Sequence, residues 1–190
     1  MDDDLTRFLA NLEPIAVEDV SWGSRMRLRM TAYLTDVMPP LRLVTSARAI
    51  VIHGDRILVA EDVDGERHVL PGGRLEASEL PEAALHREIA EETGWQVEGV
   101  RQLGVLDFRH LTPKPPDYRY PYPTFIQVIY RAEAIWHDPG RVIDDDHVVG
   151  AELVPVPMVR AIALSPVQRC LIDAAIGGRS TDRQGRNRPQ

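Results

Sequence analysis

The chain has 190 residues, of which 44% are hydrophobic, and this length suits one domain with an accessory segment. Its formal net charge of −7 excludes the positive surface that binding to duplex nucleic acid requires. The single cysteine, Cys170, excludes a disulfide framework and a cysteine-based metal site. The first residues are too acidic for a signal peptide, and no apolar run approaches the roughly 20 residues that span a bilayer. We therefore expect a cytoplasmic protein that binds neither duplex nucleic acid nor membranes.

The N-terminal segment combines a helical pattern with a strand pattern. Apolar residues recur at helical spacing over residues 5–12, and Pro14 is expected to end this helix. Strict alternation over residues 25–34 predicts a half-buried strand that carries a row of arginines, Arg25, Arg27 and Arg29. This row fits a charged, exposed edge strand, and phosphate binding is the alternative. We expect residues 1–40 to form a helix-strand extension that packs on the main sheet or on a second subunit of a homodimer.

The remainder of the chain alternates between strand and helix patterns. Runs rich in Val, Ile and Leu predict strands at residues 41–53, 56–61, 67–70, 97–107, 124–134 and 152–156. A closing helix is expected to begin at Pro166, capped by Ser165. Strands around one mid-chain helix, with a second helix at the end, predict an α/β fold in which helices sandwich a mixed sheet over residues 41–177. Residues 178–190 lack apolar side chains, and we expect them to be disordered.

The mid-chain helix carries three glutamates on one side. Pro81 suits the first helical position and Gly94 suits the position just past the end, which predicts a helix between them. Glu88, Glu91 and Glu92 are spaced at i, i+3 and i+4, so they share a stripe at the border of the apolar face. Carboxylates held this close repel one another. A divalent cation such as Mg²⁺, which prefers carboxylate oxygens and bridges to substrate phosphates, relieves that repulsion.

Residues on either side of the glutamates support this interpretation. Arg87 lies one step from the acidic stripe, and Glu79, in the preceding loop, is placed to fold back and pair with it. The strand before the loop ends at Gly72 and Gly73, which lack side chains. Their backbone carbonyls are therefore free to approach a ligand or a metal ion.

The segment from Gly73 to Trp95 resembles the Nudix box, G-x5-E-x7-R-E-U-x-E-E-x-G-U, where U is an aliphatic residue. Only Trp95 departs from the pattern, with a bulkier apolar side chain at the final aliphatic position. The fixed glycine and polar positions are all filled, by Gly73, Glu79, Arg87, Glu88, Glu91, Glu92 and Gly94. The resemblance covers roughly residues 41–177 and implies a Nudix-like α/β/α sandwich.

The resemblance also implies a chemistry. Nudix enzymes hydrolyse a nucleoside diphosphate linked to another moiety, with Mg²⁺ or Mn²⁺ neutralising the phosphates and activating water. The implied metal ligands are Glu88 and Glu92, with Glu91 sharing or bridging and the Gly72 carbonyl as a further ligand. Arg87 and Glu79 would orient these carboxylates.

The general base has two candidate positions. In the family it is a glutamate of the box, here Glu91 or Glu92, or an acid in a loop near the last strand. Residues 144–146 are three consecutive aspartates in that neighbourhood, and of these we choose Asp146. A solvated acidic loop is the alternative interpretation of this run.

The proline-rich stretch at residues 112–123 predicts a stiff loop. It holds three tyrosines, Tyr118, Tyr120 and Tyr122. Their rings are expected either to stack on a nucleobase of the substrate or to pack against the neighbouring prolines.

Two other functions compete with hydrolysis. The fold is also compatible with a non-catalytic ligand sensor or interaction domain, although such a domain has no chemical reason to retain three mutually repelling glutamates. Isomerisation of an isoprenoid diphosphate requires a reactive partner in the pocket, and Cys170 in the closing helix is a poor candidate. We therefore expect a hydrolase of a small nucleotide-derived substrate, with a mild preference for ADP-ribose-like or nucleotide-sugar compounds.

Overall fold

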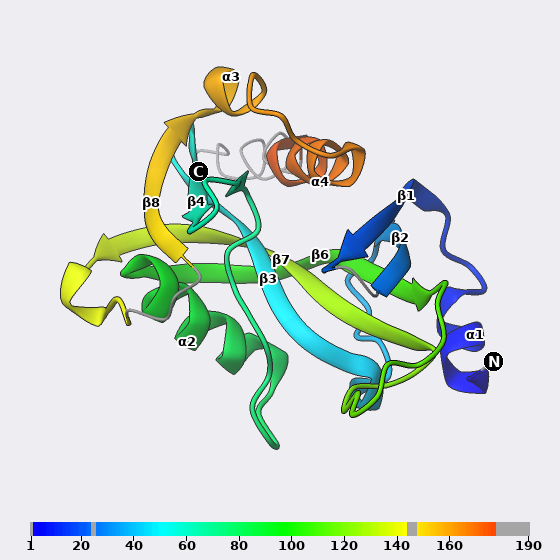
Figure 1. Ribbon diagram of the computed structural model, residues 1–190. Coiled ribbons are helices and arrows are strands. Elements are labelled where there is room, and N and C mark those ends of the chain that lie inside the picture. Colours follow the sequence, from blue (N-terminus) through cyan, green and yellow to red (C-terminus); the bar gives the residue numbers. More distant parts are fainter. Residues whose placement is uncertain (1, 24–25, 144–147, 178–190) are drawn as a thin grey trace, which may run out of the picture.

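The computed structural model describes residues 2–23, 26–143 and 148–177, and the described strands form one curled sheet (Figure 1). The strands are β1 (Pro14–Trp22), β2 (Met26–Leu34), β3 (Val44–His53), β4 (Arg56–Asp62), β5 (Arg67–His68), β6 (Trp95–His110), β7 (Thr124–His137) and β8 (Val148–Pro155). The helices are α1 (Asp3–Leu9), α2 (Pro81–Thr93), α3 (Val156–Val159) and α4 (Pro166–Gly177), with short 3-10 turns η1 (Leu41–Leu43) and η2 (Pro139–Arg141).

The sheet is mixed, and its order is β1-β2-β6-β7-β3-β4-β5, with β8 paired to β4. The pairing of β3 with β7 is parallel, whereas the other described pairs are antiparallel. Helix α2 covers one face of the sheet, and α3 and α4 cover the other (Figure 1). This arrangement confirms the predicted α/β sandwich around a mixed sheet.

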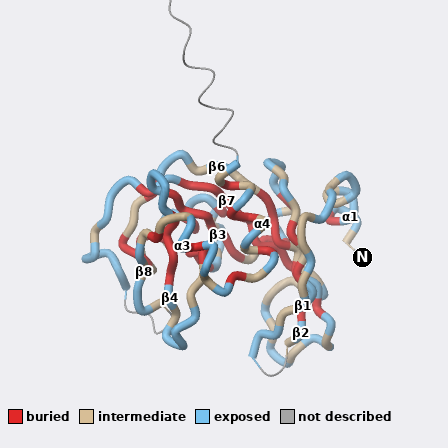
Figure 2. The backbone as a smooth tube through the Cα atoms, turned by 90° about the horizontal axis from the view of Figure 1, so that it is seen from above, coloured by how far each residue is buried: buried red, intermediate tan, exposed pale blue. Residues whose placement is uncertain are grey.

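Each face of the sheet contributes to a separate apolar core, because side chains of a strand alternate between faces. Ile50 and Ile129 belong to the cluster beneath α4, whereas Val51 and Val128 belong to the cluster beneath α2. Buried positions concentrate in the central strands and on the inner side of α4, and α1 lies off to one side (Figure 2). None of the helices in the described ranges has the length and apolar character that a membrane crossing demands.

The N-terminal extension differs from the prediction by one strand. Pro14 begins β1, and no residue of β1 is fully buried, so the sequence gives little of the alternation by which a strand is recognised. Strand β2 lies between β1 and β6, so the expectation that its arginine row marks an edge was wrong. Arg29 instead faces Asp19 of β1, with Nε 2.8 Å from Oδ1.

The sequence predicted that the extension packs either on the main sheet or on a second subunit. It packs on the main sheet, because β2 pairs with β6 over Leu28–Leu34. The division at residue 40 and a homodimer through residues 1–40 stay predictions.

Strands β3 and β4 separate soon after their hairpin. They pair only at Ile52–Ile57 and His53–Arg56, and the remaining edge of β3 is taken by the segment that follows β5. The amides of Ala47 and Ala49 donate to the carbonyls of Gly73 and Pro71, at 3.0 and 3.1 Å respectively. These two hydrogen bonds hold the loop that contains Gly72 and Gly73 alongside β3, where α2 packs.

Helix α4 begins as predicted. The Ser165 Oγ accepts a hydrogen bond from the amide of Gln168 and donates one to Glu18 Oε1 of β1, at 2.7 Å. Val167 and Leu171 are fully buried, whereas Cys170 and Ala174 are only partly buried. Ile172 and Ala175 complete the buried face of the helix. The helix therefore closes over the sheet and is tied to its far edge.

One carboxylate oxygen of the partly buried Asp107 is enclosed in the sheet without a partner among the described residues. Asp107 lies on β6 between Thr31 and Ile126, and no described residue hydrogen-bonds to its buried Oδ1. Burial raises the pKa of Asp107 to about 6, and the Arg109 charge only partly opposes this shift. The native fold therefore favours the neutral form of this side chain.

We expect Asp107→Asn to stabilise the protein above pH 6. The folded pKa lies above the unfolded one, so the native state loses stability as the pH rises from about 4 to about 6 and does not regain it at higher pH. The variant should exceed the wild type at pH 8 by on the order of 2 kcal/mol, and the difference should vanish near pH 4. Urea unfolding at several pH values measures this, with exposed Glu98→Gln on the same strand as the control. A difference that does not change with pH would contradict the assignment.

Candidate functional site

Helix α2 holds the acidic residues, and its ends are those that the sequence predicts. Pro81 occupies the first turn, and Leu80 precedes it without a side-chain cap. Gly94 ends the helix in the left-handed conformation, with φ of 71°, and its amide donates to the carbonyl of Ala90. Leu85 and Ile89 are fully buried against the sheet. The helix is therefore held by packing and by its C-terminal glycine.

The guanidinium group of Arg87 organises the acidic side of α2. Its Nε and Nη2 donate to the two carboxylate oxygens of Glu79, at 3.0 and 2.8 Å. Its Nη1 donates to Glu88 Oε1 at 2.9 Å and to Glu91 Oε2 at 3.1 Å. Nη2 also donates to the carbonyl of Arg74 at 3.0 Å. One cation thus joins three glutamates and the preceding loop, and the predicted pairing of Glu79 with Arg87 is confirmed.

The charges of these groups respond to their surroundings. The hydrogen bond from Arg87 lowers the pKa of Glu79, and the carboxylates in turn raise the pKa of Arg87. Glu88 differs, because burial raises its pKa more than the neighbouring Arg87 lowers it. Part of the ionisation cost of Glu88 is therefore left uncompensated, and a further cation nearby would favour its charged form.

Gly72 and Gly73 have no side chains, and the backbone at these residues lies against the carboxylates of Glu92 and Glu88. The Glu88 carboxylate lies so close to Gly73 that a β-carbon there would overlap it. The amide of Gly72 donates to Glu92 Oε2 at 2.8 Å. The carbonyls on either side of Gly72 accept from β3, whereas within the described part of the chain no donor reaches the carbonyl of Gly72 itself. Glu88, Glu92 and this carbonyl are thus gathered around one loop.

This donor set fits a Mg²⁺ or Mn²⁺ ion. Such ions bind through one or two carboxylates and substrate phosphates while retaining several waters, and Glu88, Glu92 and the Gly72 carbonyl supply oxygens of this kind. No three acidic, histidine or cysteine side chains of the described residues are grouped closely enough to form a ready-made cage. The sequence argument from mutual repulsion needs one correction, because Arg87 already compensates Glu88 and Glu91.

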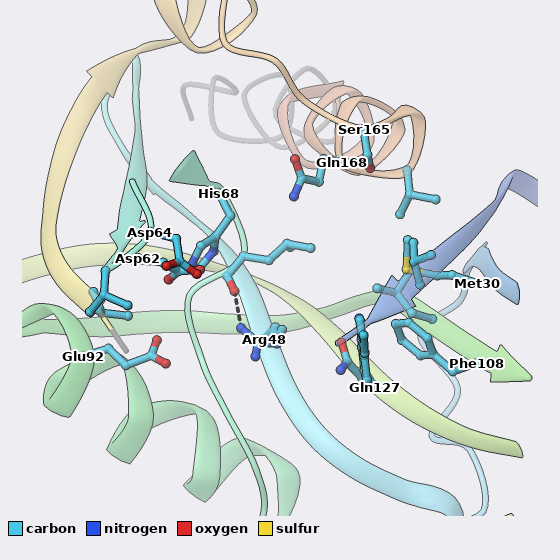
Figure 3. A pocket seen from close by; sticks show the side chains of 17 residues that line it. Met30, Arg48, Asp62, Asp64, His68, Glu92, Phe108, Gln127, Ser165 and Gln168 are labelled. Carbon is cyan, nitrogen blue, oxygen red and sulfur yellow. Dashed lines mark hydrogen bonds and ion pairs between the residues drawn. The ribbon is translucent and has the colours of Figure 1, made fainter. Parts of the chain in front are cut away.

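A cleft of about 510 Å³ runs between α4 and the sheet (Figure 3). Charged side chains gather at one end, and apolar side chains with Gln127 gather at the other (Figure 3). Of the three predicted glutamates of α2, only Glu92 lines this cleft. The ionisable lining residues are Arg48, Asp62, Asp64, His68 and Glu92.

Two functional candidates at the charged end were missed by the sequence analysis. Arg48 of β3 donates from Nη1 to the carbonyl of Leu70 at 2.9 Å, and burial lowers its pKa against the opposing charges of Glu92 and Glu88. His68 Nε2 lies 3.3 Å from Asp62 Oδ1, and burial lowers its pKa towards the neutral form. An arginine in a strand and an isolated histidine carry no spacing signal, so only the fold reveals their proximity to Glu92.

The predicted tyrosines lie elsewhere. The rings of Tyr118 and Tyr122 contact His110, with centroids 4.9 and 5.0 Å away. Tyr118 also contacts Tyr120, over which the guanidinium of Arg74 lies at 4.7 Å. None of the three tyrosines is among the described residues that line the cleft. Both their role in substrate binding and their packing against the prolines stay predictions, and the contacts that the structure shows are with His110, Arg74 and one another.

The acidic loop predicted to supply a general base lies outside the described residues. The structure describes neither Asp146 nor its two aspartate neighbours. The described part of the region ends at Ile143, whose amide donates to the carbonyl of Glu91 at 2.9 Å. Ile143 therefore lies beside the acidic helix, and the role of Asp146 stays a prediction.

Comparison with known proteins agrees with the site. The NUDIX domain model matches residues 43–175, which is more than half of the chain, so the chain belongs to the NUDIX family, a family of hydrolases that cleave pyrophosphate bonds. Over 80 residues it is 39% identical to a "MutT-like protein" of Streptomyces ambofaciens, covering 42% of this chain and 52% of the relative. Over 79 residues it is 35% identical to the "Putative ADP-ribose pyrophosphatase YjhB" of Bacillus subtilis (strain 168), covering 42% of this chain and 38% of that protein.

A solved structure supports the fold. The NUDIX hydrolase from Nitrosomonas europaea superposes with a TM-score of 0.53 at 22% identity, covering 70% of this chain and 88% of that one. Identity at this level relates the folds alone. The matches to the two curated relatives span only about half or less of their lengths.

The two loop glycines should respond differently to alanine. In Gly73→Ala the β-carbon meets the Glu88 carboxylate, the end of a side chain that can shift more readily than backbone, so metal affinity should fall about tenfold or more while the fold is retained. In Gly72→Ala the β-carbon meets the backbone of Ala47, and φ is 121°, so the variant should lose roughly 2 kcal/mol or more of stability. Mn²⁺ titration and thermal unfolding of both variants separate these effects. Equal destabilisation by the two substitutions would contradict the geometry.

Proposed function

We propose that this protein is a hydrolase, dependent on Mg²⁺ or Mn²⁺, of a phosphoanhydride bond in a nucleoside diphosphate linked to another moiety. The observation that carries the proposal is the set of oxygens around the glycine loop. Glu88 and Glu92 approach Gly73 and Gly72 while Arg87 fixes the acidic stripe, and the cleft opens at Glu92. Family membership supports the same reaction class.

The residues have distinct roles in this proposal. Glu88, Glu92 and the Gly72 carbonyl hold the metal ion, with Glu91 sharing it, and Arg87 and Glu79 fix the orientation of the carboxylates. When bound, the metal neutralises phosphoryl charge and activates the attacking water. Arg48, at the charged end of the cleft, retains guanidinium donors beyond the one bonded to Leu70, and it binds the diphosphate.

The preferred substrates are ADP-ribose-like compounds and nucleotide sugars. These molecules carry a diphosphate between two bulky groups, and the cleft has a charged end flanked by an extended apolar region. One relative is named as an ADP-ribose pyrophosphatase, and we take this as support for the same substrate class.

We expect Glu92→Gln to lower turnover at least about a hundredfold, because the amide cannot supply the carboxylate charge that the metal requires. Product formation is measured chromatographically with Mg²⁺ or Mn²⁺ on ADP-ribose, sugar nucleotides, dinucleoside polyphosphates and nucleoside triphosphates, because cleavage of ADP-ribose gives AMP and ribose 5-phosphate and no free phosphate. Glu82→Gln, an exposed glutamate in the first turn of the same helix, is the matched control. Wild-type protein that binds these nucleotides but cleaves none of them would point instead to a non-catalytic sensor.

The pH dependence of the rate should identify the general base. Loss of the base lowers kcat about 10²–10⁴-fold and removes the acidic limb of the pH–rate profile. We therefore compare Glu91→Gln with Asp146→Asn. The variant that lacks the general base should have a lowered kcat and no acidic limb, whereas the other variant should keep the acidic limb. Retention of the acidic limb in both variants would exclude these two residues and leave Glu92 as the candidate.

A further inference from the structure

Gln127 is a buried polar side chain in the wall of the cleft. It lies on β7, between Leu106 of β6 and Ser46 of β3 in the ladder, and it is 7% exposed. No residue in the described ranges donates a hydrogen bond to its carboxamide or accepts one from it. The side chain lines the cleft, and its amide is seen there (Figure 3).

The surroundings of Gln127 offer the carboxamide no hydrogen-bond partner among the described residues. Its neighbours on the same face of β7, Phe125 and Ile129, belong to the apolar cluster beneath α4. A carboxamide packed beside such groups gives up part of its hydration without gaining a described protein partner, which disfavours the native state, and its polar atoms remain accessible only from the cleft. A leucine of similar size would fill this position at no such cost. An unpartnered, buried group that opens only into a cleft is typical of a residue retained for a ligand.

Aromatic rings stand beside Gln127. Phe108 and Phe125 stack with centroids 4.9 Å apart and an interplanar angle of 4°. The indole of Trp22 contacts both rings, at 5.1 and 5.7 Å. Trp22 is nevertheless 39% exposed and lines the cleft together with Phe108 and Met30. Part of its surface is therefore available to a planar ligand.

The cleft separates charge from this apolar end. The charged lining residues lie towards Glu92, whereas Met30, Phe108 and Gln127 lie together at the opposite end (Figure 3). A phosphate group favours the first end and a neutral aromatic ring favours the second. This polarity matches that of a nucleotide bound along the cleft.

We propose that Trp22 and Gln127 form a nucleobase subsite, in which the base stacks on the Trp22 indole and the Gln127 carboxamide reads its edge. The inference rests on the proposed function, since it deepens the identity of the substrate. It assigns adenine, because a carboxamide donates and accepts side by side and pairs in this way with the amino group and ring nitrogen of adenine. The subsite differs from the tyrosine loop that the sequence suggested.

The test measures binding without turnover. AMP, GMP, CMP, UMP and ribose 5-phosphate contain no phosphoanhydride bond, and they are titrated calorimetrically into the full chain with EDTA present, so that the heat measured is that of binding alone. We expect AMP to bind at least tenfold more tightly than ribose 5-phosphate and more tightly than the other nucleotides. Gln127→Leu should weaken AMP binding about tenfold to a hundredfold and leave ribose 5-phosphate unchanged. Gln96→Leu, on β6 and outside the cleft, is the control.

Two further measurements separate recognition from folding. The thermal midpoint of Gln127→Leu should equal or exceed that of the wild type, because no protein hydrogen bond is lost. Trp22→Ala should weaken all four nucleotides without altering their order, since stacking is tolerant of base identity. Gln127→Leu with a lowered midpoint and unchanged base preference would assign the residue to packing and overturn the proposal.

The outcomes also distinguish this inference from the proposed hydrolysis. If AMP binding depends on Gln127 while no substrate is cleaved, the subsite stands and the hydrolase assignment fails. If substrates are cleaved but no nucleotide binds better than ribose 5-phosphate, the subsite is overturned and hydrolysis stands. A preference for GMP over AMP would overturn the assignment of adenine.

Discussion

The acidic side of the central helix depends on the guanidinium of a single residue, Arg87. Glu79, Glu88 and Glu91 all bond to it, so negative charges that would otherwise repel are held in fixed positions. Arginine suits this position because its planar group offers five donors at fixed angles, which a lysine ammonium does not. The same group bonds to the carbonyl of Arg74 and therefore fixes the loop as well as the helix. Order in the site thus follows from one cation with several acceptors.

The second constraint is the early separation of β4 from β3. An edge left open would expose unpaired amides, and the segment around Gly72 and Gly73 fills it. Pairing on this edge uses the carbonyls of alternate residues and leaves that of Gly72 without a described donor. A feature of sheet pairing therefore places backbone oxygen beside Glu88 and Glu92, at the point where α2 packs.

Sequence alone predicted those parts of the molecule whose signals are local. The mid-chain helix follows from Pro81, Gly94 and its apolar period, and its acidic stripe follows from spacing. Strand β1 was missed because it has no buried residue, and the edge position assigned to β2 was therefore wrong. Apart from Glu92, the charged end of the cleft was not recognised, because its residues come together from β3, β4, β5 and α2, and Gln127 was not recognised, because only the register of β7 with β3 and β6 places it. Long-range pairing of this kind leaves no pattern in a single sequence.

The hydrogen bond between Ser165 and Glu18 joins residues 147 positions apart in the chain, and it ties α4 to β1, both of which contribute residues to the lining of the cleft. Helix α4 is synthesised after every described strand, so a chain still on the ribosome holds the sheet and the glutamates but lacks one wall of the cleft. Such a nascent chain exposes the apolar face that α4 later covers, which makes it a target for chaperones. The cleft between the sheet and α4 is therefore complete only after α4 has docked.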